Sequence, residues 1–277
     1  MNYELCIILW NPDSVAFSLG PLEIRWYSLL WCVGLLAVYM LMHRLFRQQN
    51  LTEEQFEPMF IYCFIGILAG ARLGHCLFYE PEFFLSHPVE MFLPIRKFQD
   101  GQWHFTGYEG LASHGGTIGL MIALWLYHRK SGIRFLHVLD NVAIVTPVCA
   151  CAIRLGNLMN SEIIGRPTDV PWAFVFQHVD QQPRHPSQLY EALCYALFFV
   201  IVWTIYKKSS IKTGSGFYFG ICLFLIFISR IFIELTKENQ VQFESSMILN
   251  MGQLLSIPFV LIGAYYMYRG LTQDSNK

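Results

Sequence analysis

Long apolar stretches alternate with short polar segments along the whole chain. A helix needs roughly 20 mostly apolar residues to cross a bilayer, and most of the stretches approach this length. The pattern therefore predicts a polytopic, all-α integral membrane protein. Seven spanning helices are expected, with boundaries accurate to a few residues: Ser28–Met42, Met59–Phe78, Gly115–Tyr127, Val138–Leu155, Leu189–Tyr206, Gly216–Leu235 and Met247–Tyr268.

The polar segments between these stretches carry no sign of a second domain. They contain no internal repeat and no low-complexity linker, so residues 1–277 are expected to form one domain. The first twenty residues hold no Lys or Arg, and Asn11, Pro12 and Asp13 interrupt them. This is not the pattern of a cleavable signal peptide.

Lys and Arg indicate the orientation, because they concentrate in cytoplasmic loops. The better assignment places the N-terminus outside and the C-terminus in the cytoplasm. Ten Lys and Arg then fall inside: Arg44, Arg47, Arg129, Lys130, Arg134, Lys207, Lys208, Lys212, Arg269 and Lys277. Five fall outside: Arg96, Lys97, Arg166, Arg184 and Lys237.

Composition supports a membrane protein and excludes several other classes. Apolar residues make up 54% of the chain and charged residues 14%, whereas soluble domains carry about 25% charged residues. The formal net charge of -1 argues against a nucleic-acid partner. The apolar content also excludes a disordered chain.

The eight cysteines are read as small buried apolar residues, since all except Cys6 fall in strongly apolar stretches. No pair has CxxC or zinc-ligand spacing, so no disulfide framework and no metal site are expected. Walker, HExxH and GxSxG motifs are absent from the sequence, which leaves ATP use, zinc hydrolysis and a serine nucleophile without support. No cofactor is expected.

Three arginines fall inside predicted spans. Arg230 lies roughly 21 Å along a helix that enters from the cytoplasm at Gly216, and Arg72 lies roughly 20 Å along its own helix from Met59. Arg154 ends its span. Burying an arginine in hydrocarbon costs at least ~2.5–3.5 kcal/mol, so such residues tend to face the interior of the bundle and to function there. The alternative for each is a snorkelling or ion-paired arginine; together they indicate a cationic cavity toward the outer leaflet.

The third span begins with a segment suited to anion binding. Ser113 is expected to cap the helix, and Gly115 and Gly116 let another backbone or a ligand approach its N–H groups. A helix N-terminus attracts phosphate, and the imidazole of His114 suits proton transfer near neutral pH. The alternative is a packing or capping histidine.

Other polar residues are expected at the same depth. Arg154 and Asn157 share a helix face, and Glu234 stands four residues after Arg230, where it can orient or neutralise the guanidinium. Tyr27 opens the first span, a position also typical of an interfacial aromatic. Ser187 and Glu191 open the fifth span and are read as capping residues. The repeat of Gly66, Gly70 and Gly74 is read as a close-packing helix face.

An outer-leaflet cavity with arginines, a helix N-terminus and a histidine fits an anionic lipid headgroup. The residues by themselves leave two classes open: a membrane enzyme, or a transporter or flippase, for a phosphorylated amphiphile. The polar groups gather toward one leaflet, without a matching cluster on the cytoplasmic side, which favours the enzyme.

Several motifs resemble those of bacterial prolipoprotein diacylglyceryl transferases. The segment Leu-Ala-Ser-His114-Gly115-Gly116-Thr-Ile-Gly119 and the segment from Arg154 to Arg166, which reads RLGNLMNSEIIGR, are similar to the family's signature region. The similarity extends over nearly the whole chain. Further matching motifs are FSLGP with RWY at 17–27, GARLG at 70–74, RHPSQLYE at 184–191, RIFIE at 230–234 and MGQLLS at 251–256.

The resemblance implies an enzyme of the bacterial inner membrane that acts early in lipoprotein biosynthesis. Such an enzyme transfers diacylglycerol from phosphatidylglycerol to the lipobox cysteine of a preprolipoprotein signal peptide, forms a thioether and releases glycerol phosphate. It implies seven spans with the N-terminus outside. Candidate catalytic residues are then His114, Arg154, Arg230 and Tyr27; candidate substrate-binding residues are Arg154, Asn157, Gly115, Gly116, Gly165, Glu162, Arg230 and Glu234.

Two positions depart from the family pattern. Ser113 stands where many members have an aromatic residue, and Lys237 is the nearest cation after Glu234 where many have a further arginine. Neither change removes a candidate catalytic group.

Overall fold

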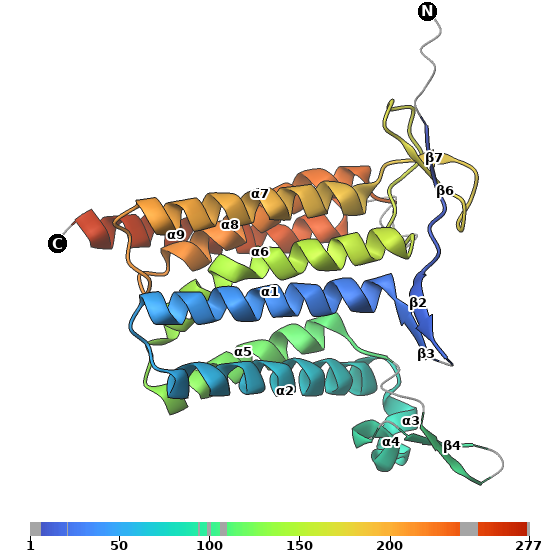
Figure 1. The fold of residues 1–277 in the computed structure, drawn as a ribbon, viewed down its shortest axis with the longest axis horizontal. Helices are drawn as coiled ribbons and strands as arrows, with labels where there is room; N and C mark the ends of the chain where they lie inside the picture. The colour runs from blue at the N-terminus through green and yellow to red at the C-terminus, as the bar shows by residue number, and fades with distance from the viewer. Residues whose placement is uncertain are drawn as a thin grey trace, which may run out of the picture. The chain divides into compact units, whose positions relative to one another are not determined.

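The computed structural model describes residues 7–20, 22–93, 95–98, 101–105, 110–238 and 249–275. Helices dominate this part of the chain (Figure 1). The long helices are α1 (Trp26–Gln48), α2 (Glu53–Phe78), α5 (Ser113–Ser131), α6 (Phe135–Met159), α7 (Ser187–Lys208), α8 (Phe217–Ile233) and α9 (Met251–Ser275). Shorter elements are α3 (Pro81–Ser86), α4 (Pro88–Phe92) and the 3₁₀ turn η1 (Glu234–Thr236).

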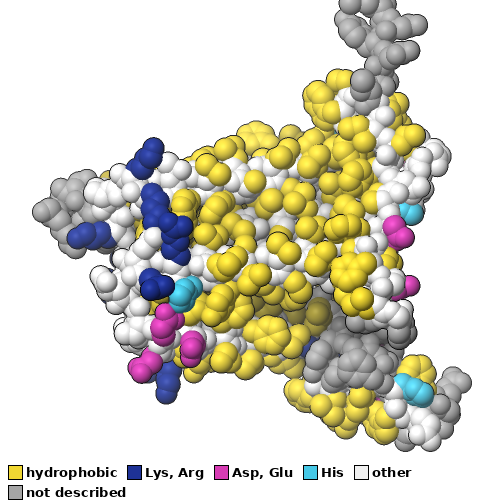
Figure 2. Space-filling model, viewed as in Figure 1, with side chains coloured by type: hydrophobic (Ala, Val, Ile, Leu, Met, Phe, Trp, Pro, Cys, Tyr) yellow, Lys and Arg dark blue, Asp and Glu magenta, His cyan; other side chains and the backbone are white. Residues whose placement is uncertain are grey.

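Six of these helices are long and apolar enough to cross a membrane: α1, α2, α6, α7, α8 and α9. They expose large apolar side chains, as lipid-facing helices do; Leu36, Ile61 and Leu193 are 58%, 60% and 62% exposed. On the face drawn in Figure 2, hydrophobic side chains cover the helices, and Lys and Arg side chains gather toward helix ends. The mainly helical membrane fold is confirmed, whereas α5 is a helix that does not meet the same criteria.

Helix ends differ from the expected boundaries for local reasons. Helix α2 begins six residues before the expected Met59, because Thr52 and Gln55 form a reciprocal capping box around an acidic first turn. Helix α5 begins at Ser113 with Ala112 in the cap position and no side-chain cap bond, so the expected Ser113 cap is wrong. It ends at Gly132, whose φ of 72° is a left-handed conformation that suits glycine.

Short strands, which the sequence analysis missed, lie before α1 and in segments between later helices. β1 (Ile8–Trp10) pairs in parallel with β6 (Phe174–Phe176), which pairs antiparallel with β7 (Pro183–Arg184). The hairpin β2 (Val15–Leu19) and β3 (Leu22–Arg25) leads into α1, and β4 (Ile95–Lys97) pairs with β5 (Trp103–Phe105). The fold is therefore helical with small sheets outside the long helices.

The chain divides into two compact units, one of residues 1–45 and 139–277 and the other of residues 46–138. The larger unit contains most of α1, α6 to α9 and the sheet β1-β6-β7, in which β1 precedes α1 and the strands β6 and β7 lie between α6 and α7 in the sequence (Figure 1). The smaller contains α2 to α5 and the β4–β5 hairpin. That all 277 residues form one domain stays a prediction.

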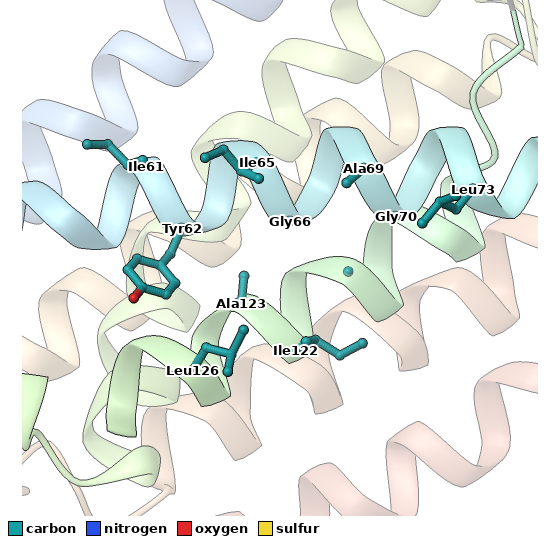
Figure 3. Close-up of a pocket in the computed structure, with 11 residues that line it drawn as sticks. Ile61, Tyr62, Ile65, Gly66, Ala69, Gly70, Leu73, Ile122, Ala123 and Leu126 are labelled. Carbon is teal, nitrogen blue, oxygen red and sulfur yellow. The ribbon is translucent and has the colours of Figure 1, made fainter. Parts of the chain in front are cut away.

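In the smaller unit, α2 and α5 pack through glycines. A Cβ on Gly70 or Gly119 would collide with backbone atoms of the facing helix, so the two backbones touch directly. The close-packing role expected for Gly66, Gly70 and Gly74 is confirmed. Beside this contact runs an apolar groove of about 390 Å³ whose floor is formed by Gly66, Gly70 and Gly119 (Figure 3).

In the larger unit, a buried carboxylate ties α6 to the start of α8. Asp140 is fully buried, and its oxygens accept N–H bonds from Gly214 at 2.7 Å, Gly216 at 2.9 Å and Phe219 at 2.8 Å. A carboxylate at a helix N-terminus satisfies N–H groups that have no partner within the helix. Helices α8 and α9 then approach closely at Gly220 and Gly263.

The α2–α5 contact yields a test with a matched control. We expect Gly119→Ala to lower the melting temperature in detergent clearly, since its Cβ would press on the Gly66 carbonyl oxygen. Gly116→Ala should change it little, because that Cβ meets its nearest atom, Ala71 Cβ, at an ordinary 3.5 Å. Thermal unfolding of the purified variants measures both; equal destabilisation would contradict glycine-specific packing at Gly119.

Candidate functional site

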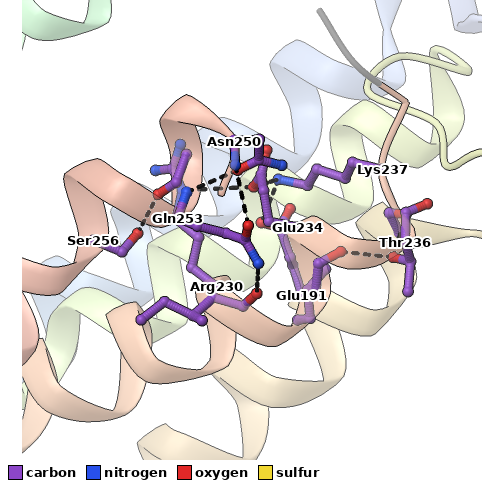
Figure 4. A network of polar contacts seen from close by, with 12 residues as sticks. Glu191, Arg230, Glu234, Thr236, Lys237, Asn250, Gln253 and Ser256 are labelled. Atoms are coloured by element: carbon purple, nitrogen blue, oxygen red, sulfur yellow. Dashed lines mark hydrogen bonds and ion pairs between the residues drawn. The ribbon is translucent and has the colours of Figure 1, made fainter. Parts of the chain in front are cut away.

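The larger unit contains a chain of alternating charges, here called the ion-pair relay, formed by Arg154, Glu191, Lys237, Glu234 and Arg230. Arg154 Nε lies 2.8 Å from Glu191 Oε2, and Lys237 Nζ lies 3.0 Å from Glu191 Oε1. Lys237 Nζ also contacts Glu234 Oε2 at 3.2 Å. Glu234 Oε2 is in turn 3.9 Å from Arg230 Nε, an ion pair too long for a hydrogen bond. The relay thus joins Arg154 to Arg230. Figure 4 shows its part from Glu191 through Lys237 and Glu234 to Arg230.

Burial is greatest in the centre of the relay and decreases toward both ends. The side chains of Glu191 and Lys237 in its centre are 1% and 7% exposed. The Arg154 side chain at one end is 21% exposed, and the Arg230 side chain at the other is 40% exposed. The buried charges in the centre therefore pair with one another, whereas the arginines at the two ends keep solvent-accessible surface.

Each relay residue comes from a different element, and local packing positions it. Arg154 lies in the last turns of α6, Glu191 in the first turns of α7, and Arg230 near the end of α8. Lys237 follows η1 and forms a β-bridge with Gly165. Glu234 is covered by α9 at Gly252, where a Cβ would lie 2.6 Å from the Glu234 carboxyl carbon.

Arg154 is linked to the loop after α6 through two amides. Its NH1 donates to Asn157 Oδ1 at 3.3 Å, which confirms that the two share a helix face. Asn157 Nδ2 then donates to Glu162 Oε2 at 3.1 Å, and Asn160 Nδ2 donates to Glu162 Oε1 at 3.0 Å. The Glu162 carboxylate is thus held on both oxygens at the edge of the relay.

The backbone around Glu162 is strained. Ser161 and Ile163 both have a φ of 55°, a left-handed conformation that β-branched residues rarely adopt. Such strain persists where the surrounding structure fixes it, often at functional sites. Here the two residues set the direction of Glu162 between them.

Gly165 lies in a contact that admits no side chain. Its N–H donates to the His185 carbonyl at 2.9 Å, and a Cβ would lie 2.5 Å from His185 Cβ and 2.6 Å from Ser187 Oγ. This explains the glycine by packing. Tyr27, in the first turn of α1, lies against Gly156, where a Cβ would be 2.9 Å from Tyr27 Cδ2. Tyr27 is therefore beside the helix turn that carries Arg154 and Asn157.

The residues of the smaller unit have other surroundings. His114 is an exposed residue in the first turn of α5. Gly115 packs against α2, where its Cβ would collide with the Gly70 carbonyl oxygen, and the Gly116 N–H donates to the Ala112 carbonyl at 3.0 Å. The close approach of another backbone, expected at these glycines, is therefore made by α2 at Gly115, and the Gly116 N–H bonds within its own helix.

Arg72, which the sequence analysis placed with Arg154 and Arg230, serves the smaller unit. It is 8% exposed, and it donates to the carbonyls of Glu90 at 2.6 Å and Met91 at 3.1 Å. Its guanidinium also lies 4.7 Å from the centre of the Phe84 ring. Carbonyls at the end of α4 attract cations, so a bundle-facing arginine here holds a short helix.

Sequence reasoning underestimated Glu191 and Lys237. Glu191 was read as a cap, yet it is the most buried member of the relay, and Lys237 was noted only as a departure from a pattern. The sequence did contain a signal. Glu191 stands one helical turn after Ser187, and Lys237 stands seven residues after Arg230. Charged residues at such positions can face the interior only when they pair with an opposite charge. No group of three or more His, Cys, Asp or Glu in the described part of the chain is arranged to hold a metal.

Comparison with known proteins gives one consistent result. The family model described as prolipoprotein diacylglyceryl transferase matches residues 14–269. A phosphatidylglycerol–prolipoprotein diacylglyceryl transferase of Bacteroides fragilis is 56% identical over 268 residues, covering 97% of each chain. Proteins of the same name from Tolumonas auensis and Porphyromonas gingivalis are 43% and 41% identical. The alignments cover 94% of this chain and 96% of the Tolumonas protein, and 95% of this chain and of the Porphyromonas protein.

Proposed function

Because the chain belongs to the prolipoprotein diacylglyceryl transferase family, it transfers a diacylglyceryl group from phosphatidylglycerol to prolipoprotein, and we propose that the ion-pair relay binds the lipid phosphate. The observation that carries this proposal is the joining of Arg154 and Arg230 by a buried chain of ion pairs whose two ends stay accessible.

The charge of the relay supports an anionic ligand. Its three cations and two carboxylates leave one net positive charge, and the carboxylates are turned toward the buried lysine. Arg230 Nε is buried with no hydrogen-bond acceptor among the described residues. A phosphate oxygen would supply that acceptor, and guanidinium forks match phosphate oxygens in pairs.

The reaction needs this stabilisation most in its transition state. The cysteine sulfur forms a bond to a glycerol carbon of the lipid, the bond from that carbon to the phosphate oxygen breaks, and glycerol phosphate leaves with the electron pair. Negative charge therefore grows on the phosphate as the bond breaks. Fixed arginines in a site of low dielectric stabilise such charge without reorganisation.

Other candidate residues take supporting roles in this proposal. Asn157 and Glu162 orient Arg154, Glu234 orients Arg230, and Gly165 fixes the strand that carries Lys237. Tyr27 lies beside the turn that holds Arg154 and is proposed to contact substrate. Gly115 and Gly116 directly follow His114 in the sequence, and they belong to the proposed substrate site for that reason.

We assign His114 the removal of the thiol proton. Its exposed imidazole is a base suited to neutral pH. The thiolate is the reacting form of cysteine, and free cysteine has a pKa near 8.5, so a base accelerates the reaction at pH 7. The acceptor in this proposal is the lipobox cysteine of a preprolipoprotein signal peptide.

The proposed setting is the bacterial inner membrane, with seven spans, the N-terminus outside, the C-terminus in the cytoplasm and the site toward the outer leaflet. The cytoplasmic excess of Lys and Arg, ten against five, supports this orientation. The gathering of basic side chains at helix ends is consistent with it (Figure 2). A transporter or flippase for an anionic lipid is not favoured, because the named relatives are transferases.

The substrate assignment is tested with the purified protein, phosphatidylglycerol and a synthetic lipobox peptide. Mass spectrometry should detect a peptide whose mass has increased by one diacylglyceryl group attached as a thioether. The same peptide with serine in place of the lipobox cysteine should remain unmodified, since a hydroxyl is a far weaker nucleophile at pH 7. Modification of the serine peptide would contradict the cysteine as acceptor.

The relay proposal predicts that Arg230→Lys lowers kcat strongly, by at least about tenfold, although charge is kept. A lysine ammonium is a point charge and loses the paired contact of the guanidinium fork with phosphate. The assay above measures kcat, and Lys212→Gln, which removes an exposed cation between α7 and α8, serves as the control. Near-normal kcat in folded Arg230→Lys would overturn the fork at this position.

For His114→Gln we expect lipid binding to persist while transfer at pH 7 slows at least about tenfold, since losing a general base typically costs about 10²–10⁴-fold. Raising the pH toward 8.5 should partly restore the variant, because the peptide then supplies thiolate unaided. Rates are measured from pH 6 to 9. A loss that is equal at every pH would assign His114 to positioning rather than to proton removal.

A further inference from the structure

Arg184 is a buried arginine outside the relay that contacts three separate segments. It lies in β7, and its side chain is 9% exposed. Its Nε donates to Asp180 Oδ2 at 2.9 Å and its NH2 to the same carboxylate. Its NH1 donates to the Gly165 carbonyl at 3.2 Å and to Glu238 Oε2 at 3.2 Å. One guanidinium therefore joins the loop after α6, the loop before α7 and the segment after η1.

Those three segments form a continuous backbone ladder. Gly165 bridges Lys237, the Arg166 N–H donates to the Thr236 carbonyl at 2.9 Å, and Pro167 bridges Arg184. Ser187 Oγ lies 2.9 Å from Thr236 Oγ1 on the same ladder. The backbone of Lys237 is thus fixed on one side by Gly165 and followed directly by Glu238, and Arg184 contacts both of these residues.

Lys237 depends on that backbone for its place in the relay. Its ammonium sits between Glu191 Oε1 at 3.0 Å and Glu234 Oε2 at 3.2 Å, and its side chain is 7% exposed. A shift of about 1 Å in the chain would break one of these contacts, since ion pairs weaken beyond about 4 Å. Glu191 would then be left buried with one partner instead of two, which is costly for a charge.

We propose that Arg184 is a positioning residue for the transfer reaction, acting through the backbone of Gly165 and Glu238 to hold Lys237 between Glu191 and Glu234. The inference rests on the proposed function of the relay. Arg184 contacts no substrate; it fixes the centre of the relay so that Arg154 and Arg230 stay at a set separation.

The ion pair with Asp180 keeps the Arg184 side chain in place over a wide pH range. The hydrogen bonds from the guanidinium hold the pKa of the Asp180 carboxyl below its usual range. The contact of Asp180 with Arg184 therefore remains charged throughout the pH range in which the enzyme would be assayed. Three of the five guanidinium N–H groups donate hydrogen bonds to Asp180 or to the Gly165 carbonyl, so the side chain has little rotational freedom.

The test is a double-mutant cycle of Arg184→Gln and Lys237→Met, with kcat and KM measured on folded, full-length protein well below its melting temperature. We expect each single variant to lower kcat about tenfold, with a smaller change in KM, because the arginine ends of the relay act in the transition state. If Arg184 acts through Lys237, the double variant should lose no more than Lys237→Met alone.

Three outcomes would overturn the proposal: normal kcat in folded Arg184→Gln, losses that multiply to about a hundredfold in the double variant, or a fall in melting temperature with kcat unchanged. The last is the signature of a purely structural arginine. If Arg184→Gln does not fold, Glu238→Gln replaces it, since the Glu238 side chain is 56% exposed. A smaller kcat loss that disappears in the Lys237→Met background is then expected, and its persistence there would contradict the proposal.

Arg154→Lys and Arg230→Lys, measured in the same assay, separate this proposal from the function of the relay. Loss of kcat in both together with normal kcat in Arg184→Gln would leave the relay intact and reject Arg184 as a positioning residue. Normal kcat in all three would reject the relay itself. Lys212→Gln again controls for the loss of one positive charge from the chain.

Discussion

The ion-pair relay depends on one buried carboxylate. Glu191 is 1% exposed, and an isolated charge at such a position is strongly unfavourable. It is tolerated because Arg154 and Lys237 contact its two oxygens from different elements. That requirement brings the end of α6, the start of α7 and the segment after η1 to one point, and removing either cation would leave the charge with too few partners.

Glycines determine how closely the helices around this point approach. Helices in lipid gain little from apolar burial against one another, so contact between backbones contributes much of their association. Gly220 with Gly263 joins α8 to α9, and Gly252 lets α9 lie over Glu234. These packing glycines therefore decide whether the charged groups of the relay can meet.

The parts of the fold that follow from local sequence were predictable. A continuous apolar run predicts a spanning helix wherever it lies, and the described residues include six helices long and apolar enough to cross a membrane. The start of α2 was missed because its first turn is acidic, although the capping box of Thr52 and Gln55 was legible. The strands were missed because pairing of Ile8 with Phe174 depends on tertiary structure rather than on any local pattern.

For the site, spacing within one helix was informative and position between helices was not. The contact of Arg154 with Asn157 follows from three-residue spacing. Depth along a helix, however, does not tell which neighbour a side chain faces, and the bonds of Arg72 to the carbonyls of Glu90 and Met91 were therefore not foreseen. Glu191 was overlooked because an acid near a helix start is usually a solvated cap, and its burial depends on elements distant in sequence.

The arginines at the two ends of the relay differ in how firmly neighbouring side chains hold them. Arg154 is already held by Glu191 and Asn157 before substrate arrives, so most of its rotameric entropy is lost during folding and little remains to be lost on binding. Arg230 pairs with Glu234 at a longer distance, 3.9 Å, and its side chain is 40% exposed, so it keeps more freedom. In the proposed function, Arg154 is thus the fixed contact of the lipid phosphate, and Arg230 is the contact that adjusts to the headgroup.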